Sequence, residues 1–385
     1  MKVLFVDPMM VGSHAIYATS LLSNLGGDCD VEILGNSLYG GADVPSNMTY
    51  NKTFAYTKKN GLSKLLSYLQ SLKEVYCKVK NERPDIIHIQ WLKLHSLESY
   101  FYLWLRRRYK SKILFTAHNI LPHDTGDKYY KAYKRFYNGI DATIVHDRNT
   151  KQELVKMFCV DEDKVHVIGH GIVCFKTDKN MEAAEEKDFI VKHGIKSDIL
   201  VFASMGVQSR YKGTDVLIES WLECKELHDN PKCALVIAGN CRELNLHKVR
   251  EASNIYIEDG FLSDERFNGI MHRTDVLVLP YRMISQSGVT MQAIDYKIPI
   301  LVTDVGGLAD PLSIANIGWK IDSCRKDLLQ EKLIALVRNA EKVRALKNDN
   351  EIEWIKVQRA YSWNEIGKQT FSLYNSILNK KYCKQ

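Results

Sequence analysis

Short apolar runs alternate with amphipathic stretches along the first half of the chain. The apolar runs are rich in strand-forming residues and lie at 2–7, 31–34, 85–92, 112–119, 142–147 and 164–171. Stretches such as 14–25 and 62–80 lie between them and carry apolar residues at the spacing of one helical face. Buried strands that alternate with helices are typical of a parallel sheet covered on both faces. The pattern therefore predicts an α/β fold.

A second series of the same kind follows a more polar stretch at 176–198. The simplest interpretation is two doubly wound, Rossmann-like domains joined near 172–195. The N-terminal domain is predicted over 1–172 and the C-terminal domain over 173–360. Two further helical patterns, at about 327–346 and 363–379, end the chain, and the last has enough apolar surface to pack on a large partner.

Length and cysteine usage narrow the class of protein. A chain of 385 residues with 45% hydrophobic content is long and apolar enough to form two domains, each with its own core. It has no apolar run near the roughly 20 residues that span a bilayer, and Asp7 comes too early for a signal peptide. The nine cysteines form no C-x-x-C pair and no Cys/His cluster at metal-ligand spacing. We expect a cytoplasmic chain with reduced cysteines, no metal site and no cofactor.

The net charge of +7 is concentrated in the N-terminal half, where residues 1–170 hold 23 Lys+Arg and 17 Asp+Glu. This asymmetry fits an anionic partner, such as phospholipid head groups or nucleic acid, or simply a soluble surface. The segment 99–112, SYFYLWLRRRYKSK, is either a membrane-surface helix or a core helix with a basic last turn. Nucleic acid fits less well, because aromatic and basic residues interleave only here.

Candidate chemistry lies at the strand-to-helix turns, because ligands of parallel sheets bind beyond the carboxyl ends of the strands. Gly12 follows the first strand and precedes a helix, which favours an anion or a hydroxyl-rich ligand. The turn at 116–124 carries His118, His123 and Asp124, whose spacing suits polar contacts to a ligand better than a metal. Neither a G-x-G-x-x-G fingerprint nor a P-loop is present, so the sequence does not support a nicotinamide-dependent enzyme or a P-loop NTPase.

Two turns in the second half suit a pyrophosphate. Gly206 allows a tight turn after a strand, and Arg210 and Lys212 then place cations next to a helix start. Residues 287–289 (Ser287, Gly288 and Val289) are predicted at the N-terminus of another helix, where backbone N–H groups can hold phosphate oxygens. Gln292, one turn further, can reach a sugar hydroxyl near those phosphates. We interpret the two turns as a nucleotide diphosphate site.

These residues resemble the GT-B glycosyltransferases of the large retaining family 4. The segments that carry the resemblance are YKGTDVLIES, LVIAGN, DVLVLPY, VIGHGI, HNILPHD and, above all, SQSGVTMQAIDYKIPILVTDVGG. The resemblance implies two Rossmann-like domains facing each other across a cleft, with residues 361–385 crossing back to the first domain. It also implies metal-independent transfer of a hexose-type sugar from a UDP- or GDP-linked donor. The charge asymmetry and segment 99–112 favour a glycan or lipid-linked acceptor in cell-surface polysaccharide synthesis.

The resemblance also implies residue roles. Lys212, with Arg210, binds the donor diphosphate together with the backbone of 287–289, and Gln292 replaces a glutamate that holds the ribose. His118 reaches the donor sugar, and Gly12 lies in the loop where donor phosphate and acceptor meet. The family's other glutamate is absent, with Ile284 or Ser285 in its place, and its usual arginine is Ser209.

Several alternatives stay open at this point. Retention by front-face attack is the favoured outcome, whereas an inverting reaction would need a base, for which Asp124 is the candidate. The chain could instead be a non-catalytic GT-B subunit that partners an active transferase, or a nucleotide-sugar epimerase. A cytoplasmic enzyme bound peripherally at the inner face of the cell membrane is the expected location.

Overall fold

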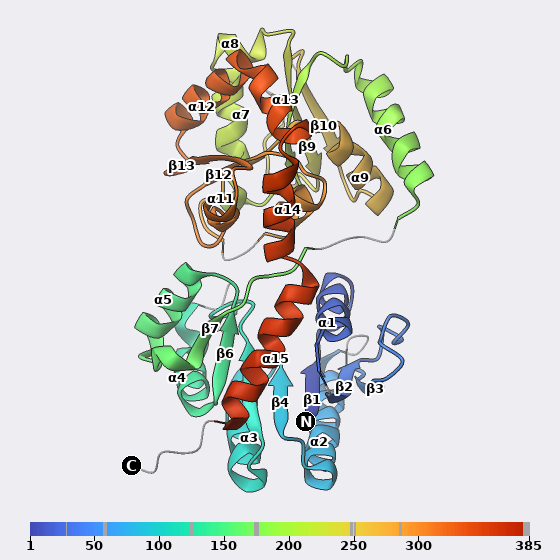
Figure 1. Ribbon diagram of the computed structural model, residues 1–385, viewed down its shortest axis with the longest axis vertical. Helices are drawn as coiled ribbons and strands as arrows, with labels where there is room; N and C mark the ends of the chain where they lie inside the picture. The colour runs from blue at the N-terminus through green and yellow to red at the C-terminus, as the bar shows by residue number, and fades with distance from the viewer. Residues whose placement is uncertain are drawn as a thin grey trace. The chain divides into compact units, whose positions relative to one another are not determined.

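The computed structural model describes residues 1–27, 29–56, 60–122, 126–172, 177–246, 249, 252–284 and 287–379 (Figure 1). The chain divides into two compact units. Unit 1 comprises Met1–Gly171 and the C-terminal stretch that begins at Ser362, and unit 2 comprises Ile172–Tyr361. Each unit contains one parallel sheet with helices on both faces, so the predicted α/β architecture is confirmed.

The sheet of unit 1 has the strand order β3-β2-β1-β4-β5-β6-β7, and all of its neighbouring strands are parallel. Its strands are β1 (Lys2–Asp7), β2 (Asp30–Asn36), β3 (Thr49–Phe54), β4 (Ile86–Ile89), β5 (Lys112–Thr116), β6 (Ala142–Val145) and β7 (Val165–Val167). The central strands are buried because their side chains are apolar on both faces, as in the fully buried IIHI of β4.

Two layers of helices cover this sheet. One layer contains α2 (Gly61–Glu82), α3 (His95–Tyr109), α4 (Tyr130–Gly139) and α5 (Arg148–Phe158). The other contains α1 (Ser13–Ser23) and the C-terminal α15 (Trp363–Asn379). Two short 3₁₀ turns, η1 (Gly126–Tyr129) and η2 (Glu162–Lys164), complete the unit.

Helix α15 packs on unit 1, as the resemblance implies for the end of the chain. Its Gly367 lies so close to α1 that an added Cβ would stand 2.0 Å from the carbonyl oxygen of Asn24. Its Tyr374 is fully buried, and the hydroxyl lies 2.6 Å from Nδ1 of His88 in the centre of the sheet. The apolar surface of this helix is therefore accounted for.

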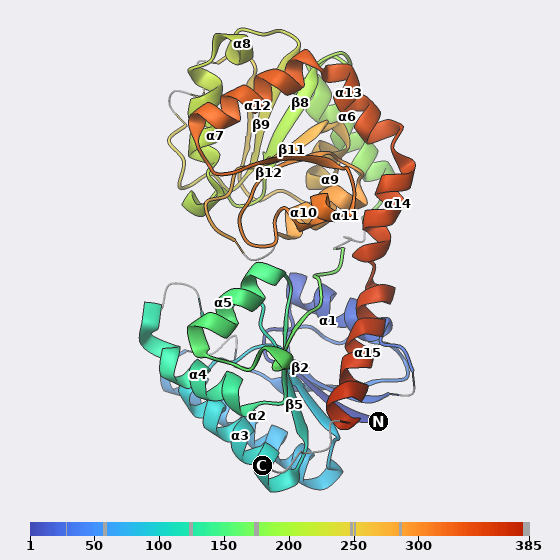
Figure 2. The same cartoon turned by 60° about the vertical axis from the view of Figure 1, so that its left-hand side comes forward.

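The sheet of unit 2 has the order β10-β9-β8-β11-β12-β13 and is also parallel. Its strands are β8 (Leu200–Met205), β9 (Cys233–Gly239), β10 (Ile255–Asp259), β11 (Val276–Leu279), β12 (Ile300–Thr303) and β13 (Gly318–Ile321). Figure 2 labels its strands β8, β9, β11 and β12. One face carries α6 (Lys179–His193), α9 (Asp264–Arg273), α10 (Gly288–Asp295), α11 (Asp310–Ile314) and α14 (Glu351–Ala360). The other carries α7 (Thr214–Leu222), α8 (Lys225–His228), α12 (Lys326–Arg338) and α13 (Ala340–Asn348).

The structure differs from the sequence prediction at three elements. The polar stretch at 176–198 contains α6, which packs on α9 through buried Phe189 and through Arg266, whose guanidinium pairs with Asp188 at 2.8 Å. The single helix expected over 327–346 is divided into α12 and α13 at Asn339. Strand β3 was not predicted, because its sequence TYNKTF is polar and lies at the sheet edge.

In both sheets the strand order reverses at one point, between β1 and β4 in unit 1 and between β8 and β11 in unit 2. Open α/β sheets bind ligands beyond the carboxyl ends of the strands at such switch points. The turns singled out from the sequence at Gly12, Gly206 and 287–289 follow β1, β8 and β11. None of the helices in the described parts of the chain is long and apolar enough to cross a membrane.

Candidate active site

In unit 2, the turn after β8 is held by a buried glutamine. Gly206 has a φ of +91°, and its N–H donates to Ala238 O at 2.9 Å. The amide nitrogen of Gln208 donates to three carbonyl oxygens, including Gly206 O at 3.0 Å and Ala238 O at 3.2 Å. Its oxygen accepts from Thr214 Oγ1 at 2.6 Å, at the start of α7. Gln208 thus fixes the path of the backbone between β8 and α7.

Lys212 ends the short 3₁₀ turn η3 (Arg210–Lys212), and its side chain folds back beneath Gly206. It is only 7% exposed, and its Nζ donates to Met205 O at 3.3 Å and lies 5.5 Å from the centre of the Tyr281 ring. Burial lowers the pKa of Lys212 to about 8. An ammonium has three donors, so this buried cation has capacity left for an anion.

Arg210 takes a different position from Lys212. Its side chain is exposed, and its backbone N–H donates to Glu243 Oε2 at 2.8 Å. Arg282 pairs with both carboxylate oxygens of Asp215, at 2.9 and 2.8 Å, and its other contact is to the carbonyl oxygen of Arg210. Arg282 thereby ties the turn after β11 to the turn after β8, a role that the sequence analysis missed.

Helix α10 presents its N-terminus at the neighbouring turn. Ser287 is the N-cap, and its hydroxyl accepts from Thr290 N at 3.4 Å. Gly288 is exposed, and a Cβ added there would meet nothing within 4 Å. A Cβ added to Gly206 would lie 3.1 Å from Lys212 Nζ and 3.6 Å from Val289 Cγ2. The structure therefore brings the glycine turn, the buried lysine and the helix N-terminus together within unit 2.

Gln292, one turn along α10, is 5% exposed, and its Nε2 has no hydrogen-bond partner among the residues that the structure describes. A buried donor without a partner costs about 1–3 kcal/mol. Thr290 Oγ1 on the same helix is likewise buried without a partner in the described part of the chain. A cation, a helix N-terminus and unpaired polar groups at one strand edge suit an anionic ligand that carries hydroxyl groups.

In unit 1, the turn after β1 combines a glycine with a buried acid. Gly12 precedes α1 with a φ of +57° and is exposed. The carboxylate of Asp7, at the end of β1, accepts from Met9 N at 2.8 Å and is only 1% exposed. Burial raises the pKa of Asp7 to about 7. The carboxyl group at the end of β1 can therefore hold a proton near neutral pH.

His118 follows β5 and lies in a network of polar and aromatic rings. Its Nε2 lies 3.0 Å from Gln90 Oε1, and its Nδ1 lies 3.2 Å from His146 Nε2. The ring stacks on Trp91, with centroids 4.8 Å apart and planes 9° from parallel, and Tyr17 packs edge-on at 4.9 Å. No three of the described His, Cys, Asp and Glu side chains are placed to hold a metal ion.

The proton positions in this network follow from its fixed acceptor. His146 Nδ1 lies 3.0 Å from Ile168 O, which can only accept. With Gln90 Oε1 as the acceptor at the other end, the His118–His146 pair must supply three N–H protons, whereas two neutral imidazoles hold two. Burial opposes a charged ring: it places the pKa of His118 well below its usual value and that of His146 at about 4.

A half turn of the Gln90 amide resolves this conflict. Its NH2 group then donates to His118 Nε2, and its oxygen accepts from Thr116 Oγ1 or from His88 Nε2, the groups that its nitrogen otherwise contacts. We therefore assign both His118 and His146 as neutral rings protonated at Nδ1.

This assignment predicts the imidazole nitrogen spectrum. At pH 7, ¹⁵N resonances are expected to show neutral His118 and His146, each protonated at Nδ1. Gln90→Glu offers only acceptor oxygens, so it should draw a second proton onto His118 and raise its pKa, whereas Gln90→Met should leave the ring neutral. A doubly protonated His118 in the unaltered protein at pH 7 would contradict the assignment.

The remaining predicted residues of this turn, His123 and Asp124, lie outside the residues that the structure describes. Of the residues that the sequence missed, Gln90 and His146 follow strands β4 and β6, so the strand-end rule could have found them. Gln208 and Arg282 also lie in turns that follow strands, but only the folded backbone shows which carbonyl groups they join.

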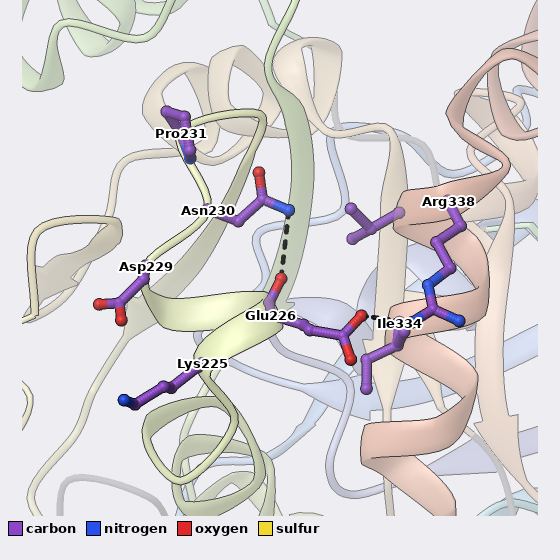
Figure 3. Close-up of a pocket in the computed structure, with 8 residues that line it drawn as sticks. Lys225, Glu226, Asp229, Asn230, Pro231, Ile334 and Arg338 are labelled. Atoms are coloured by element: carbon purple, nitrogen blue, oxygen red, sulfur yellow. Dashed lines mark hydrogen bonds and ion pairs between the residues drawn. The ribbon is translucent and has the colours of Figure 1, made fainter.

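A shallow pocket of about 320 Å³ lies elsewhere in unit 2 (Figure 3). Asn230 and Pro231 in its wall directly precede β9, so it lies at the amino end of the strand, away from the turns described above. Its polar groups already pair with each other: Arg338 contacts Glu226 Oε2 at 2.5 Å, and Asn230 Nδ2 donates to Glu226 O at 3.1 Å. It offers no buried, unpaired group to a ligand.

Comparison with known proteins agrees with this geometry. The family described as Glycosyltransferase Family 4 matches residues 15–174, and the family described as Glycosyl transferases group 1 matches residues 185–352. A Methanocaldococcus jannaschii protein named as a glycosyltransferase is 24% identical over 406 aligned positions, which cover 95% of each chain. Bacillus subtilis TuaC, named for teichuronic acid biosynthesis, is 24% identical over 50% of this chain and 45% of its own.

Solved structures show the same fold. A glycosyltransferase from Rickettsia africae has a TM-score of 0.72 at 16% identity over 99% of both chains. Anabaena Alr3699/HepE, solved in complex with UDP, has a TM-score of 0.72 at 13% identity and covers 98% of this chain and 100% of its own. With two family matches that together span most of the sequence, this GT-B chain belongs to the family 4, group 1 glycosyltransferases and is an enzyme of that family.

Proposed function

We propose that this enzyme transfers a hexose from a UDP- or GDP-linked sugar to a glycan or lipid-linked acceptor. The observation that carries the donor assignment is Gln292. Its buried Nε2 has no partner in the described part of unit 2, and the residue lies one turn along α10 from the N-terminus of that helix. The ribose hydroxyl of a nucleotide supplies the missing acceptor, and its diphosphate supplies the anion.

The donor diphosphate is assigned to Lys212 and to the backbone N–H groups of residues 287–289. Gly206 and Gly288 keep the approach free of side chains, because no Cβ blocks it at either turn. Arg210 belongs to the same proposal as an exposed cation that reaches the outer phosphate. Lys212 and the α10 N-terminus then stabilise the negative charge that develops as the diphosphate leaves, without a metal ion.

The proposed reaction retains the configuration of the sugar. The bond between the anomeric carbon and the diphosphate oxygen breaks, and the acceptor oxygen forms its bond on the same face. The acceptor proton passes to the leaving phosphate. In an inverting reaction a carboxylate would take that proton instead, and Asp124 is the residue assigned to it.

His118 is proposed to contact the donor sugar, and Gly12 to line the turn where donor phosphate and acceptor meet. Both ring nitrogens of His118 already have partners in unit 1. A sugar hydroxyl that binds the ring must therefore displace one of them. The Gln90 amide is the partner that can turn away, because His146 is anchored by the backbone carbonyl of Ile168.

The acceptor proposal is a cell-surface polysaccharide or its lipid-linked precursor. It is supported by relatives: TuaC is named for teichuronic acid biosynthesis, and WaaG, a structure with a TM-score of 0.59, is described as involved in lipopolysaccharide biosynthesis. Such an acceptor would bring a cytoplasmic enzyme to the inner face of the cell membrane.

Variants of Gln292 test the donor site. Gln292→Leu removes the unpaired donor, so we expect unchanged or higher thermal stability without ligand and about tenfold weaker nucleotide-sugar binding. Gln292→Glu can still accept a hydrogen bond from a ribose hydroxyl and should keep binding. Thermal shifts with a panel of UDP-, GDP- and ADP-sugars measure both effects. Equal nucleotide-sugar thermal shifts for Gln292→Leu and the unaltered protein would show that Gln292 does not contact the donor.

A further inference from the structure

Helix α2 exposes a row of leucines to solvent. Leu62, Leu65, Leu66 and Leu69 are 69%, 42%, 58% and 37% exposed. Their spacing of three, four and seven residues places them on one face of the helix. The buried residues that pack on the sheet, such as Leu72 and Val75, form a stripe that adjoins this row. An amphipathic surface helix normally exposes polar residues, so this row has no explanation within unit 1.

Helix α3 exposes a second apolar row. Leu97, Tyr100 and Trp104 are 47%, 61% and 47% exposed, at helical spacing. Tyr102 and Leu105 on the other side of the helix are fully buried in the core. The structure therefore confirms that segment 99–112 is a core-packed helix with a basic last turn, and it leaves aromatic residues exposed on the other face of that helix.

The two rows belong to one surface. Helices α2 and α3 contact each other in the same layer of unit 1 (Figures 1 and 2). The rings of Tyr76 on α2 and Trp104 on α3 pack at 5.8 Å. Both helices connect parallel strands, so they run in the same direction. Leu69 lies seven residues before Tyr76, and Leu97 lies seven residues before Trp104, so the two leucines lie at the same level along the helix pair. We call the surface formed by these residues the α2–α3 face.

The segment that contains the α2–α3 face is rich in basic residues. Residues 61–110 contain ten Lys+Arg and four Asp+Glu, so this segment alone carries +6 of the chain's net +7. One of the acids, Glu98, is buried, and its carboxylate accepts hydrogen bonds from Lys93 N and Leu94 N at 2.6 Å. At the end of α3, the guanidinium groups of Arg83 and Arg108 lie over the Tyr109 ring at 4.4 and 5.5 Å.

We propose that the α2–α3 face docks on the surface of an anionic lipid bilayer. Leucines that enter the acyl boundary, Trp and Tyr at head-group depth and flanking Lys and Arg make up the surface that such an interface requires. A protein partner would not by itself call for so large an excess of basic residues in the segment that carries the apolar face. The inference deepens the proposed lipid-linked acceptor, but the contact itself needs neither donor nor transfer.

Vesicle sedimentation tests this proposal. The full chain is expected to bind phosphatidylcholine vesicles that contain 30% phosphatidylglycerol at least tenfold more tightly than pure phosphatidylcholine, and to lose that preference at high salt. The double variant Leu62→Ser/Leu66→Ser and the charge variant Arg107→Glu/Arg108→Glu should each weaken binding at least tenfold. Ile352→Ser/Ile355→Ser, which alters exposed apolar residues of α14 in unit 2, is the matched control and should bind normally.

The proposal that this face binds lipid would be overturned by equal binding to neutral and anionic vesicles. Unchanged binding by both face variants would overturn it as well. Tighter binding to a soluble polyanion such as heparin than to vesicles would also overturn it, because the leucines would then be irrelevant. Each variant should keep its melting temperature and its nucleotide-sugar thermal shift. Loss of lipid binding with the shift intact therefore concerns only this surface, and loss of the shift concerns only the donor site.

Discussion

Lys212→Met is expected to lower transfer from a nucleotide sugar by about 10²–10³-fold in kcat/KM. The lysine is the buried cation of the proposed donor site, and removal of one preorganised group that stabilises developing charge costs about this much in enzymes. Methionine keeps most of the side-chain volume beneath Gly206, so the loss should reflect the missing charge rather than a cavity. Steady-state kinetics with the preferred donor measure the effect.

The same substitution should raise the stability of the protein without ligand. Burial lowers the pKa of Lys212 from 10.5 to about 8, so at pH 7 the buried charge opposes folding by roughly 3 kcal/mol. Methionine removes that cost. A higher melting temperature of Lys212→Met together with lost donor binding would show that the lysine serves ligand binding. A melting temperature that falls together with activity would indicate a structural role.

The lowered pKa also predicts how donor affinity depends on pH. Lys212 is charged below about pH 8 and loses its proton above it, and a bound diphosphate favours the charged form. Affinity should therefore be constant from pH 6.5 to 7.5 and fall as the pH rises past 8. Lys212→Arg keeps its charge over this range, so its affinity, whatever its level, should not fall. A parallel fall in both proteins would assign the titration to another group.

Gly239→Ala is expected to destabilise unit 2 by at least about 2 kcal/mol, because two costs add. Gly239 has a φ of +117°, which is costly for any residue with a side chain. Its added Cβ would also lie 2.2 Å from the carbonyl oxygen of Gly206, so the turn beside Lys212 would have to move. Calorimetry should show a lower melting temperature for the transition of unit 2.

Gly288→Ala is the matched control for that result. Gly288 has no positive φ, and its added Cβ meets nothing within 4 Å, so stability should stay within about 0.5 kcal/mol. The methyl group would nevertheless stand where phosphate oxygens approach the helix N-terminus, so donor binding should weaken. Equal destabilisation by both substitutions would contradict the different roles given to the two glycines.

Much of the fold could be predicted because apolar periodicity reports burial directly. The run KVLFVD predicted a strand over 2–7, and β1 occupies the same residues. Helix α15 likewise covers the predicted 363–379. Strand β3 and helix α6 were missed because both are polar and rely on tertiary contacts: α6 contributes Phe189 to the core and acidic side chains to Arg266.

The candidate site could be predicted only in part. Gly206, Lys212 and Val289 were singled out from sequence and do meet in the folded unit, because turns after adjacent parallel strands lie at one edge of the sheet. Arg210 was paired with Lys212 from sequence, but its side chain is exposed while that of Lys212 is buried. Sequence spacing does not reveal side-chain direction within a short 3₁₀ turn, and that direction decides which cation is desolvated.

Calorimetric titration of UDP- and GDP-sugars into the protein and into Lys212→Met tests most directly whether unit 2 binds the donor through this lysine. At least one nucleotide sugar is expected to bind to the unaltered protein with one site per chain. Binding to Lys212→Met should be at least 100-fold weaker, although this variant is no less stable. Absence of binding by every nucleotide sugar, or equal affinity in the two proteins, would contradict the assignment of unit 2 as the donor site.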